Sequence, residues 1–236
     1  MPTKKWYKRL AFTVLRTAIL FFTLSFLWVL IYKWVNPPFT YLMLKRKLEA
    51  VFLGKSNKIK YQFVPYDRIS SNLKMAVIAS EDQKFPTHIG FDFEAIDNAI
   101  VRNKKNKRKY GASTISQQTA KNVFLWDGRN FIRKGLEAYF TTLIEFLWGK
   151  KRILEVYLNV VEMGNLTFGA EVSSRKYFNK SAATLSLEEA TSIAAVLPNP
   201  IIFKVKTPTK FIINKKMWIK NQYYALGGKK YINDLK

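Results

Sequence analysis

The sequence contains no cysteine and a single histidine, His88. Without cysteine the chain has no disulfide, thiolate metal site or cysteine nucleophile. One histidine excludes a metal site built from several histidine ligands. Acidic residues are also few, with 16 Asp and Glu against 40 Lys and Arg, for a formal charge of +24. This excess indicates an anionic partner such as nucleic acid, an acidic membrane surface or a phosphorylated substrate.

One long apolar run is present, over residues 10–32, with Arg16 as its only charge. As a helix it would be roughly 34 Å long, against a bilayer core of about 30 Å. A cleaved signal peptide has an apolar region of only about 7–15 residues and a small-residue cleavage site. We therefore predict a retained transmembrane helix.

The charges around this run bear on its orientation. Residues 1–9 are basic and favour a cytoplasmic N-terminus, but more Lys and Arg follow soon after the run. Asn36 and two prolines then end the helix. The basic, aromatic segment 33–60 is either a solvated linker or a piece that lies on anionic headgroups.

The whole chain has 236 residues and is 48% hydrophobic, so it can bury one sizeable core with a small second lobe. No alternating strand series or internal repeat is evident, so the pattern predicts a mostly α domain. The expected helical segments are 69–82, 93–103, 115–122, 131–149, 150–164 and 185–200. In the last of these, Ser186 with Glu189 three residues on is typical of a helix N-terminus.

The helix that begins after Thr114 has an unusual polar face. Thr114 with Gln117 matches a capping box. The positions where a core helix would carry an apolar stripe instead hold Ser116, Gln117, Gln118, Lys121 and Asn122. Carboxamides both donate and accept hydrogen bonds, so this face is suited to polar contacts.

Two acids flank this helix in the sequence. Glu81 precedes Asp82 in EDQKFPTHIG, and Glu137 follows Arg133 and Lys134 on one helix face. Alone, the first pair is typical of a solvated helix end and the second group of a surface ion pair. Their combination with the polar helix and a membrane anchor favours an active site.

These residues resemble a known family. The segments EDQKFPTHIGFD, GASTISQQTAKN, RKGLEAYFTTLIE and KKRILEVYLN, in this order, look like the four central motifs of the peptidoglycan glycosyltransferases. This family includes the polymerase module of bifunctional penicillin-binding proteins. The resemblance runs from about residue 61 to LPNP and is closest to the monofunctional biosynthetic transglycosylases. It implies a lysozyme-like α-helical domain with a small membrane-associated lobe, preceded by one transmembrane helix.

The resemblance also implies the chemistry. Lipid II, a disaccharide-pentapeptide on a polyprenyl pyrophosphate, would be joined to a growing glycan strand by one inverting displacement. Glu81 would act as the general base, and Glu137 would orient cations, ligate a divalent ion or stabilise the donor sugar. His88 is expected to have a structural role and not a catalytic one. Together with Phe85 it would shape the loop of the first motif, and Gly90 would permit the turn of that loop. The implied substrate-binding residues are Asp82, Phe85, His88, Thr114, Gln117, Gln118, Lys121, Asn122, Arg129, Arg133 and Lys134.

Further expectations concern organisation and partners. The resemblance implies a glycosyltransferase domain over 61–228, a basic tail over 229–236 and a position in the inner membrane with the domain in the periplasm. The basic run 102–109 is expected as a solvated loop or as one attracted to membrane or pyrophosphate. The sequence requires no cofactor, although Mg²⁺ or Mn²⁺ could bind at the pyrophosphate. The implied partners are lipid II, the growing glycan strand and the membrane, and cell-wall synthesis proteins are further candidates.

Three other functions fit the sequence less well. A bifunctional penicillin-binding protein needs a Lys-Thr-Gly element that the chain lacks. A lysozyme-like lytic enzyme needs no pyrophosphate cations, so the Lys and Arg residues around Glu137 argue against it. A membrane-tethered nucleic-acid-binding protein would use the positive charge, but no zinc, helix-turn-helix or aromatic RNA motif is evident.

Overall fold

The protein is described by a computed structural model that covers residues 4–105, 111–128, 130–233 and 235. Over these residues it is mostly helical, which confirms the predicted fold class. The helices are α1 (Lys4–Tyr32), α2 (Tyr41–Phe52), α3 (Ser71–Glu81), α4 (Phe93–Lys105), α5 (Ile115–Phe124), α6 (Phe131–Leu147), α7 (Lys150–Val160), α8 (Ala170–Phe178), α9 (Leu187–Val196) and α10 (Lys210–Ala225). Three short 3₁₀ helices are η1 (Tyr66–Arg68), η2 (Ala182–Thr184) and η3 (Gly228–Ile232).

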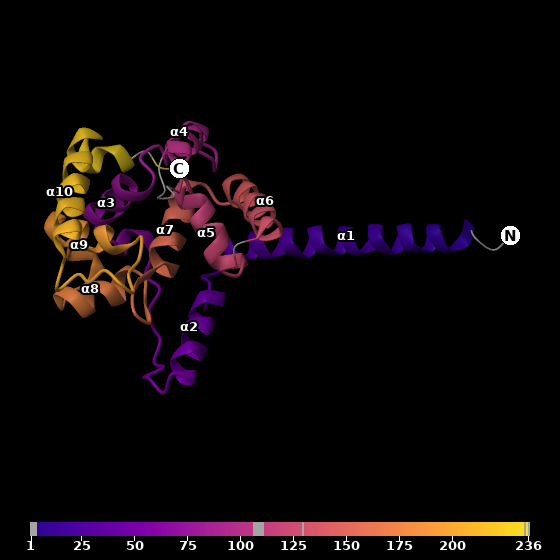
Figure 1. The fold of residues 1–236 in the computed structure, drawn as a ribbon, viewed down its shortest axis with the longest axis horizontal. Coiled ribbons are helices and arrows are strands. Elements are labelled where there is room, and N and C mark those ends of the chain that lie inside the picture. The colour runs from indigo at the N-terminus through magenta and orange to yellow at the C-terminus, as the bar shows by residue number, and fades with distance from the viewer. Residues whose placement is uncertain (1–3, 106–110, 129, 234, 236) are drawn as a thin grey trace.

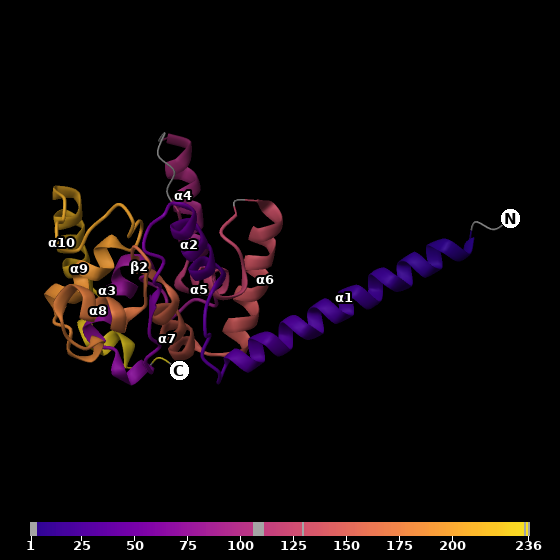
Figure 2. The same cartoon turned by 90° about the horizontal axis from the view of Figure 1, so that it is seen from below.

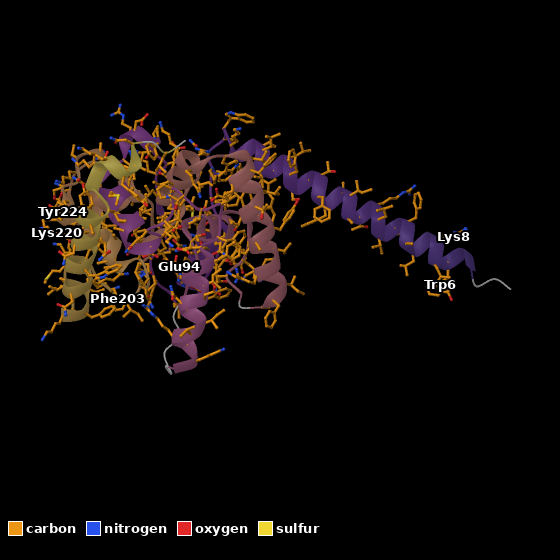
Figure 3. All side chains as sticks on the ribbon, turned by 90° about the horizontal axis from the view of Figure 1, so that it is seen from above. Trp6, Lys8, Glu94, Phe203, Lys220 and Tyr224 are labelled. Carbon is orange, nitrogen blue, oxygen red and sulfur yellow. The ribbon has the colours of Figure 1, made fainter. Side chains whose placement is uncertain are left out.

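Helix α1 projects far out of the globular part (Figures 1 and 2). Trp6 and Lys8 lie at its distant end, away from every other element, whereas Lys220 and Tyr224 of α10 mark the opposite end of the molecule (Figure 3). Residues 6–32 are long and apolar enough to cross a membrane, and most of their apolar side chains are exposed. This fits the predicted membrane anchor at 10–32.

The last turns of α1 belong to the domain core. Val29 is fully buried, and its carbonyl oxygen accepts a hydrogen bond from the Trp148 indole nitrogen over 2.7 Å. The Ser25 hydroxyl lies 2.7 Å from that of Tyr139. Arg152 donates to the Tyr32 carbonyl oxygen. The apolar run is therefore exposed and long enough to cross a membrane at one end, and a packed core element at the other.

Helix α2 lies within the segment 33–60 that was expected as a linker or headgroup-binding piece. Thr40 caps it by accepting from the Met43 backbone nitrogen, and Met43 itself is buried. Ion pairs of Lys45 with Asp127 at 2.5 Å and of Arg46 with Glu162 at 3.0 Å fasten α2 to the domain. Tertiary ion pairs between distant segments, which local composition does not reveal, make this segment part of the fold.

Helix α3 is the centre of the globular part. Every residue from Leu73 to Ala79 is buried, and α9, α10 and η3 pack around the helix. A helix that is apolar on all sides is stable only when surrounded in this way. Even Lys74 is buried, with its ammonium group 3.7 Å from the centre of the Tyr66 ring.

A small sheet corrects the prediction that helix continues to residue 164. Helix α7 ends at Val160, and β2 (Glu162–Gly164) pairs antiparallel with β3 (Thr167–Phe168), which pairs parallel with β1 (Lys60–Tyr61). Gly169 follows β3 with φ +85°, and a Cβ there would lie 2.4 Å from the Asn159 carbonyl oxygen. Strands this short carry no readable alternation, so the pairing partners decide the structure.

Two further segments differ from expectation. Residues 102–105 of the basic run form the last turn of α4, which extends beyond the rest of the domain (Figure 2), while 106–109 lie outside the described residues. The expected basic tail contains η3, whose Ile232 is buried in the core. Helices α8 and α10 were not among the predicted segments.

Candidate active site

The first candidate motif forms a loop that is tied to the start of α5. Asp82, directly after α3, accepts a hydrogen bond from the Ile115 backbone nitrogen over 2.9 Å. His88 Nε2 lies 3.0 Å from both carboxylate oxygens of Asp82. The Thr114 hydroxyl donates to the Gly90 carbonyl oxygen over 2.6 Å. Asp82 and Thr114 thus hold the two motifs together, and the structural role expected of His88 stays a prediction.

Gly90 is required by geometry at the end of this loop. Its φ is +79°, a region that side chains disfavour. An added Cβ would also lie 2.8 Å from Cγ2 of Thr141 on α6. The turn therefore brings the loop into close contact with α6.

Glu81 is the last residue of α3 and borders a pocket of about 310 Å³. Its side chain is 14% exposed. Oε2 accepts a hydrogen bond from Gln118 Nε2 over 3.3 Å, and Oε1 accepts one from the Ser80 hydroxyl over 3.0 Å. The Lys215 ammonium group on α10 lies 3.9 Å from Oε1. The carboxylate is thus held in place and still reaches open space.

The two adjacent glutamines of α5 serve different purposes. Gln117 is buried and completes the predicted capping box, accepting from the Thr114 backbone nitrogen over 3.1 Å. Gln118 contacts Glu81 through its amide nitrogen, and its amide oxygen accepts from the Tyr157 hydroxyl over 3.2 Å. Burial raises the pKa of Tyr157 well above its ordinary value, so this phenol keeps its proton and donates.

Glu137 gathers cations at the first turns of α6. Its two oxygens accept hydrogen bonds from Arg133 and Lys134, both at 2.5 Å, and its side chain is buried. Lys121 on α5 is close enough for Glu137 to be its strongest charged neighbour. Burial lowers the pKa of Lys121, and Glu137 partly opposes this effect. One buried acid with three cations leaves a net positive site.

Comparison with known proteins identifies the domain. The family model described as "Transglycosylase" matches residues 48–223. The chain belongs to the transglycosylase family. A biosynthetic peptidoglycan transglycosylase of Pseudomonas fluorescens SBW25 is 51% identical over 211 residues, 89% of this chain and 88% of that protein.

Two more relatives carry the same name. One from Pseudomonas fluorescens Pf-5 is 47% identical over 228 residues, 96% of this chain and 95% of that protein. One from Yersinia pseudotuberculosis YPIII is 50% identical over 208 residues, 87% and 86% of the two chains. The resemblance found in the four motifs is confirmed, and the protein is a glycosyltransferase.

Within this transglycosylase domain, several predicted substrate contacts are buried. Phe85 lies in the core, and the centre of its ring is 4.7 Å from the Lys150 ammonium group. Asp82, Thr114 and Gln117 form hydrogen bonds with other residues of the protein. Asn122 is buried beside a small recess that Lys121 also lines. Substrate contacts by these residues stay predictions, and Arg129 lies outside the described residues.

Three residues near the site were not foreseen. Glu145, two turns after Glu137 on α6, accepts from the Ser116 hydroxyl and from Lys150. Its spacing from Glu137 offered a sequence signal, because residues eight apart share a helix face. Tyr157 lies within the fourth motif, KKRILEVYLN, whereas Lys215 gave no signal, since it reaches the site only because α10 packs against α3.

Proposed function

We propose that the protein polymerises lipid II into β-1,4-linked glycan strands, with Glu81 as general base. The observation that carries this proposal is the arrangement along α5. Gln118 contacts Glu81, while Lys121, three residues later on the same helix face, lies beside the cations of α6. Helix α5 thus contacts the proposed base at the end of α3 and also carries one cation of a site for an anionic leaving group.

The proposed reaction is a single displacement. The 4-hydroxyl of the acceptor gives its proton to the Glu81 carboxylate as its oxygen attacks the anomeric carbon of the donor strand. The α-linked pyrophosphate leaves with the bonding electrons, and a β-1,4 bond forms. A positioned base contributes roughly 10² to 10⁴-fold to such a reaction. The Lys215 ammonium group lies 3.9 Å from Oε1 of the Glu81 carboxylate.

The cations would stabilise the leaving group. Lys121, Arg133 and Lys134 provide positive charge where negative charge grows on the departing pyrophosphate. Glu137 holds Arg133 and Lys134 in fixed positions through both of its oxygens. This division of roles gives each of the two acids a separate function.

A divalent cation stays a prediction. The described residues include no group of three or more His, Asp or Glu side chains able to hold a metal. Glu137 already uses both oxygens for hydrogen bonds. Mg²⁺ or Mn²⁺ would therefore be held chiefly by the phosphate oxygens of the substrate, as is common for Mg²⁺.

The proposed location follows from α1. A single-pass anchor in the inner membrane, with the domain in the periplasm, would put the enzyme where membrane-bound lipid II is polymerised. The exposed apolar surface of α1 supports the membrane anchor. The function of the family supports a catalytic domain on the periplasmic side of the membrane. Association with other cell-wall synthesis proteins stays a prediction.

Incubation of the purified full-length protein with labelled lipid II tests the function. We expect long strands on a gel that disappear after muramidase treatment. Release of free disaccharide from preformed glycan would instead favour the lytic alternative. Absence of any strand under conditions where a related polymerase is active would contradict the proposal.

A further inference from the structure

The carbonyl end of α1 is closed by side chains of the globular domain. The last carbonyl groups of a helix have no amide partner within the helix. At this end of α1, the Val29 carbonyl oxygen accepts from the Trp148 indole nitrogen. The Tyr32 carbonyl oxygen accepts from Nη2 of Arg152 over 2.9 Å, and the same nitrogen donates over 2.9 Å to the Val35 carbonyl oxygen, just beyond the helix. A cation at this position also suits the negative end of the helix dipole.

Arg152 is itself held in one position. Its Nη1 donates to Glu155 over 2.5 Å and to the Asn36 side-chain oxygen over 3.0 Å. The other oxygen of Glu155 accepts from the Tyr66 backbone nitrogen over 2.7 Å. The Arg152 side chain is only 13% exposed, and its guanidinium carbon lies 5.6 Å from the centre of the Phe63 ring. Because the guanidinium group is planar and its donors point in fixed directions, it also fixes the segment of chain that it contacts.

The contacts with the domain line one face of α1. Ser25, Val29 and Tyr32 are spaced four and three residues apart, so they lie above one another on the helix surface. Ser25 and Val29 contact α6 and its C-cap residue, whereas Tyr32 contacts Arg152 on α7. The domain end of α1 lies beside these two helices (Figure 2). Two helices thus hold α1 at points about two turns apart, which determines its tilt.

The tilt matters for a substrate that is also tied to the bilayer. In the proposed function, α1 holds the enzyme in the membrane and the polyprenyl chain holds lipid II there. Asn36, Pro37 and Pro38 end the helix directly after this joint. A free joint would let the domain take many orientations over the membrane, and only a fraction of them could receive the substrate. The apparent affinity would be reduced by that fraction.

We propose that Arg152 fixes the tilt of the catalytic domain on α1 and thereby holds the active site at the height of the membrane-bound substrate. This inference rests on the proposed function and on the proposed membrane anchor. Arg152 lines neither the pocket beside Glu81 nor the recess beside Lys121. It is therefore a positioning residue, which acts through the orientation of the whole domain.

Kinetics in two environments test this role. Arg152→Met keeps an aliphatic side chain and removes the hydrogen-bond donors. For the full-length variant with lipid II in phosphatidylglycerol vesicles, we expect KM to rise about tenfold with little change in kcat, since only part of the orientations can bind. With lipid II in detergent, where the substrate diffuses freely, both constants should stay close to those of the wild type. An equal loss in the two environments would mean that Arg152 only stabilises the fold, which overturns the inference.

Two further variants separate position from charge. Arg152→Lys keeps a cation beside Glu155 but lacks the planar group, so we expect the same rise in KM in vesicles alone. It also decides the question if Arg152→Met does not fold. Arg68→Met, at an exposed arginine of η1, is the control and should match the wild type in both environments. A wild-type KM in Arg152→Lys, or an equal rise in Arg68→Met, would mean that only positive charge matters and would overturn the inference.

A distance measurement tests the tilt directly. Because the sequence has no cysteine, spin labels can be attached at Leu20→Cys on α1 and Tyr224→Cys on α10, both at exposed positions. In full-length protein in vesicles, we expect one narrow distribution of distances between the two labels. The distribution should broaden when Arg152→Met or Arg152→Lys is added. An unchanged distribution in both variants would contradict the proposed role.

The outcomes separate this inference from the proposed function. If the wild-type protein makes no strands, the proposed function fails, while the label distances still report whether Arg152 fixes the tilt. If the wild type makes strands but the Arg152 variants keep the wild-type KM in vesicles and the wild-type distances, only the inference about Arg152 fails.

Discussion

Lys215 on α10 lies 3.9 Å from Glu81 at the end of α3. Burial lowers the pKa of Lys215 below its ordinary value of 10.5, and the Glu81 carboxylate partly restores it. The two residues are distant in sequence and meet because α10 packs directly against α3.

Replacing Glu81 tests the base. Glu81→Gln is nearly isosteric, so we expect the fold and membrane insertion to be kept while polymerisation falls by about 10²-fold or more, the range of general-base catalysis. Strand synthesis from lipid II measures this. Glu94→Gln, at an exposed acid paired with Lys84, is the control. Activity of Glu81→Gln within about tenfold of wild type would rule out the role.

The pH dependence of kcat/KM tests Lys215. Because burial lowers the pKa of Lys215, its ammonium group is deprotonated at a lower pH than an ordinary lysine, whose pKa is 10.5. As pH rises through this lowered pKa, the positive charge beside Glu81 is lost. We expect an alkaline fall in kcat/KM that moves to higher pH in Lys215→Arg, since arginine stays charged. Lys121→Arg is the comparison, because burial also lowers the pKa of Lys121. A shift only in Lys121→Arg would assign the titration to the pyrophosphate site.

Removing the Lys121 charge tests the leaving-group site. We expect Lys121→Ala to lower kcat/KM by about 10² to 10³-fold, the scale of losing one preorganised donor. Stability should change little, because burial disfavours the charged form of Lys121 and the fold therefore gains little from its ammonium group. Lys104→Ala, at an exposed position of α4, is the charge-matched control. Equal, mild losses in both variants would mean that Lys121 provides only general attraction to an acidic membrane.

Two truncations test the double role of α1. Deletion of residues 1–24 should leave a folded domain that polymerises detergent-solubilised lipid II. Deletion of residues 1–32 also removes Val29 and leaves the Trp148 indole nitrogen without its partner, which costs about 1–3 kcal/mol for that group alone. We therefore expect a lower Tm for the longer deletion. Equal melting temperatures would show that the end of α1 is dispensable to the core.

Gly90→Ala tests the coupling of the first loop to α6. The substitution places a Cβ at φ +79° and 2.8 Å from Thr141. We expect it to destabilise the domain by about 1–3 kcal/mol, since it combines backbone strain with a steric clash. Gly111→Ala, where no atom lies within 4 Å of the added Cβ, should have almost no effect. Denaturant unfolding of both variants decides it.

Local patterns in the sequence were enough to predict much of the structure. The N-caps at Thr114 and Ser186 are present with both hydrogen bonds of the capping box. The apolar run at 10–32 lies within α1, and the motifs placed Glu81 and Gln118 in one site. Such features depend on residues a few positions apart, so short-range spacing carries the information.

Only the tertiary structure decided how distant segments meet. It placed Lys215 beside Glu81, separated the buried Gln117 from the site-facing Gln118, and made α2 one side of an apolar pocket that α1 and α5 also line. It also turned the end of α1 into core and residues 162–164 into strand. These outcomes depend on packing and pairing between segments far apart in the chain, and a segment's own sequence does not encode which partner will satisfy its apolar surface and backbone hydrogen bonds.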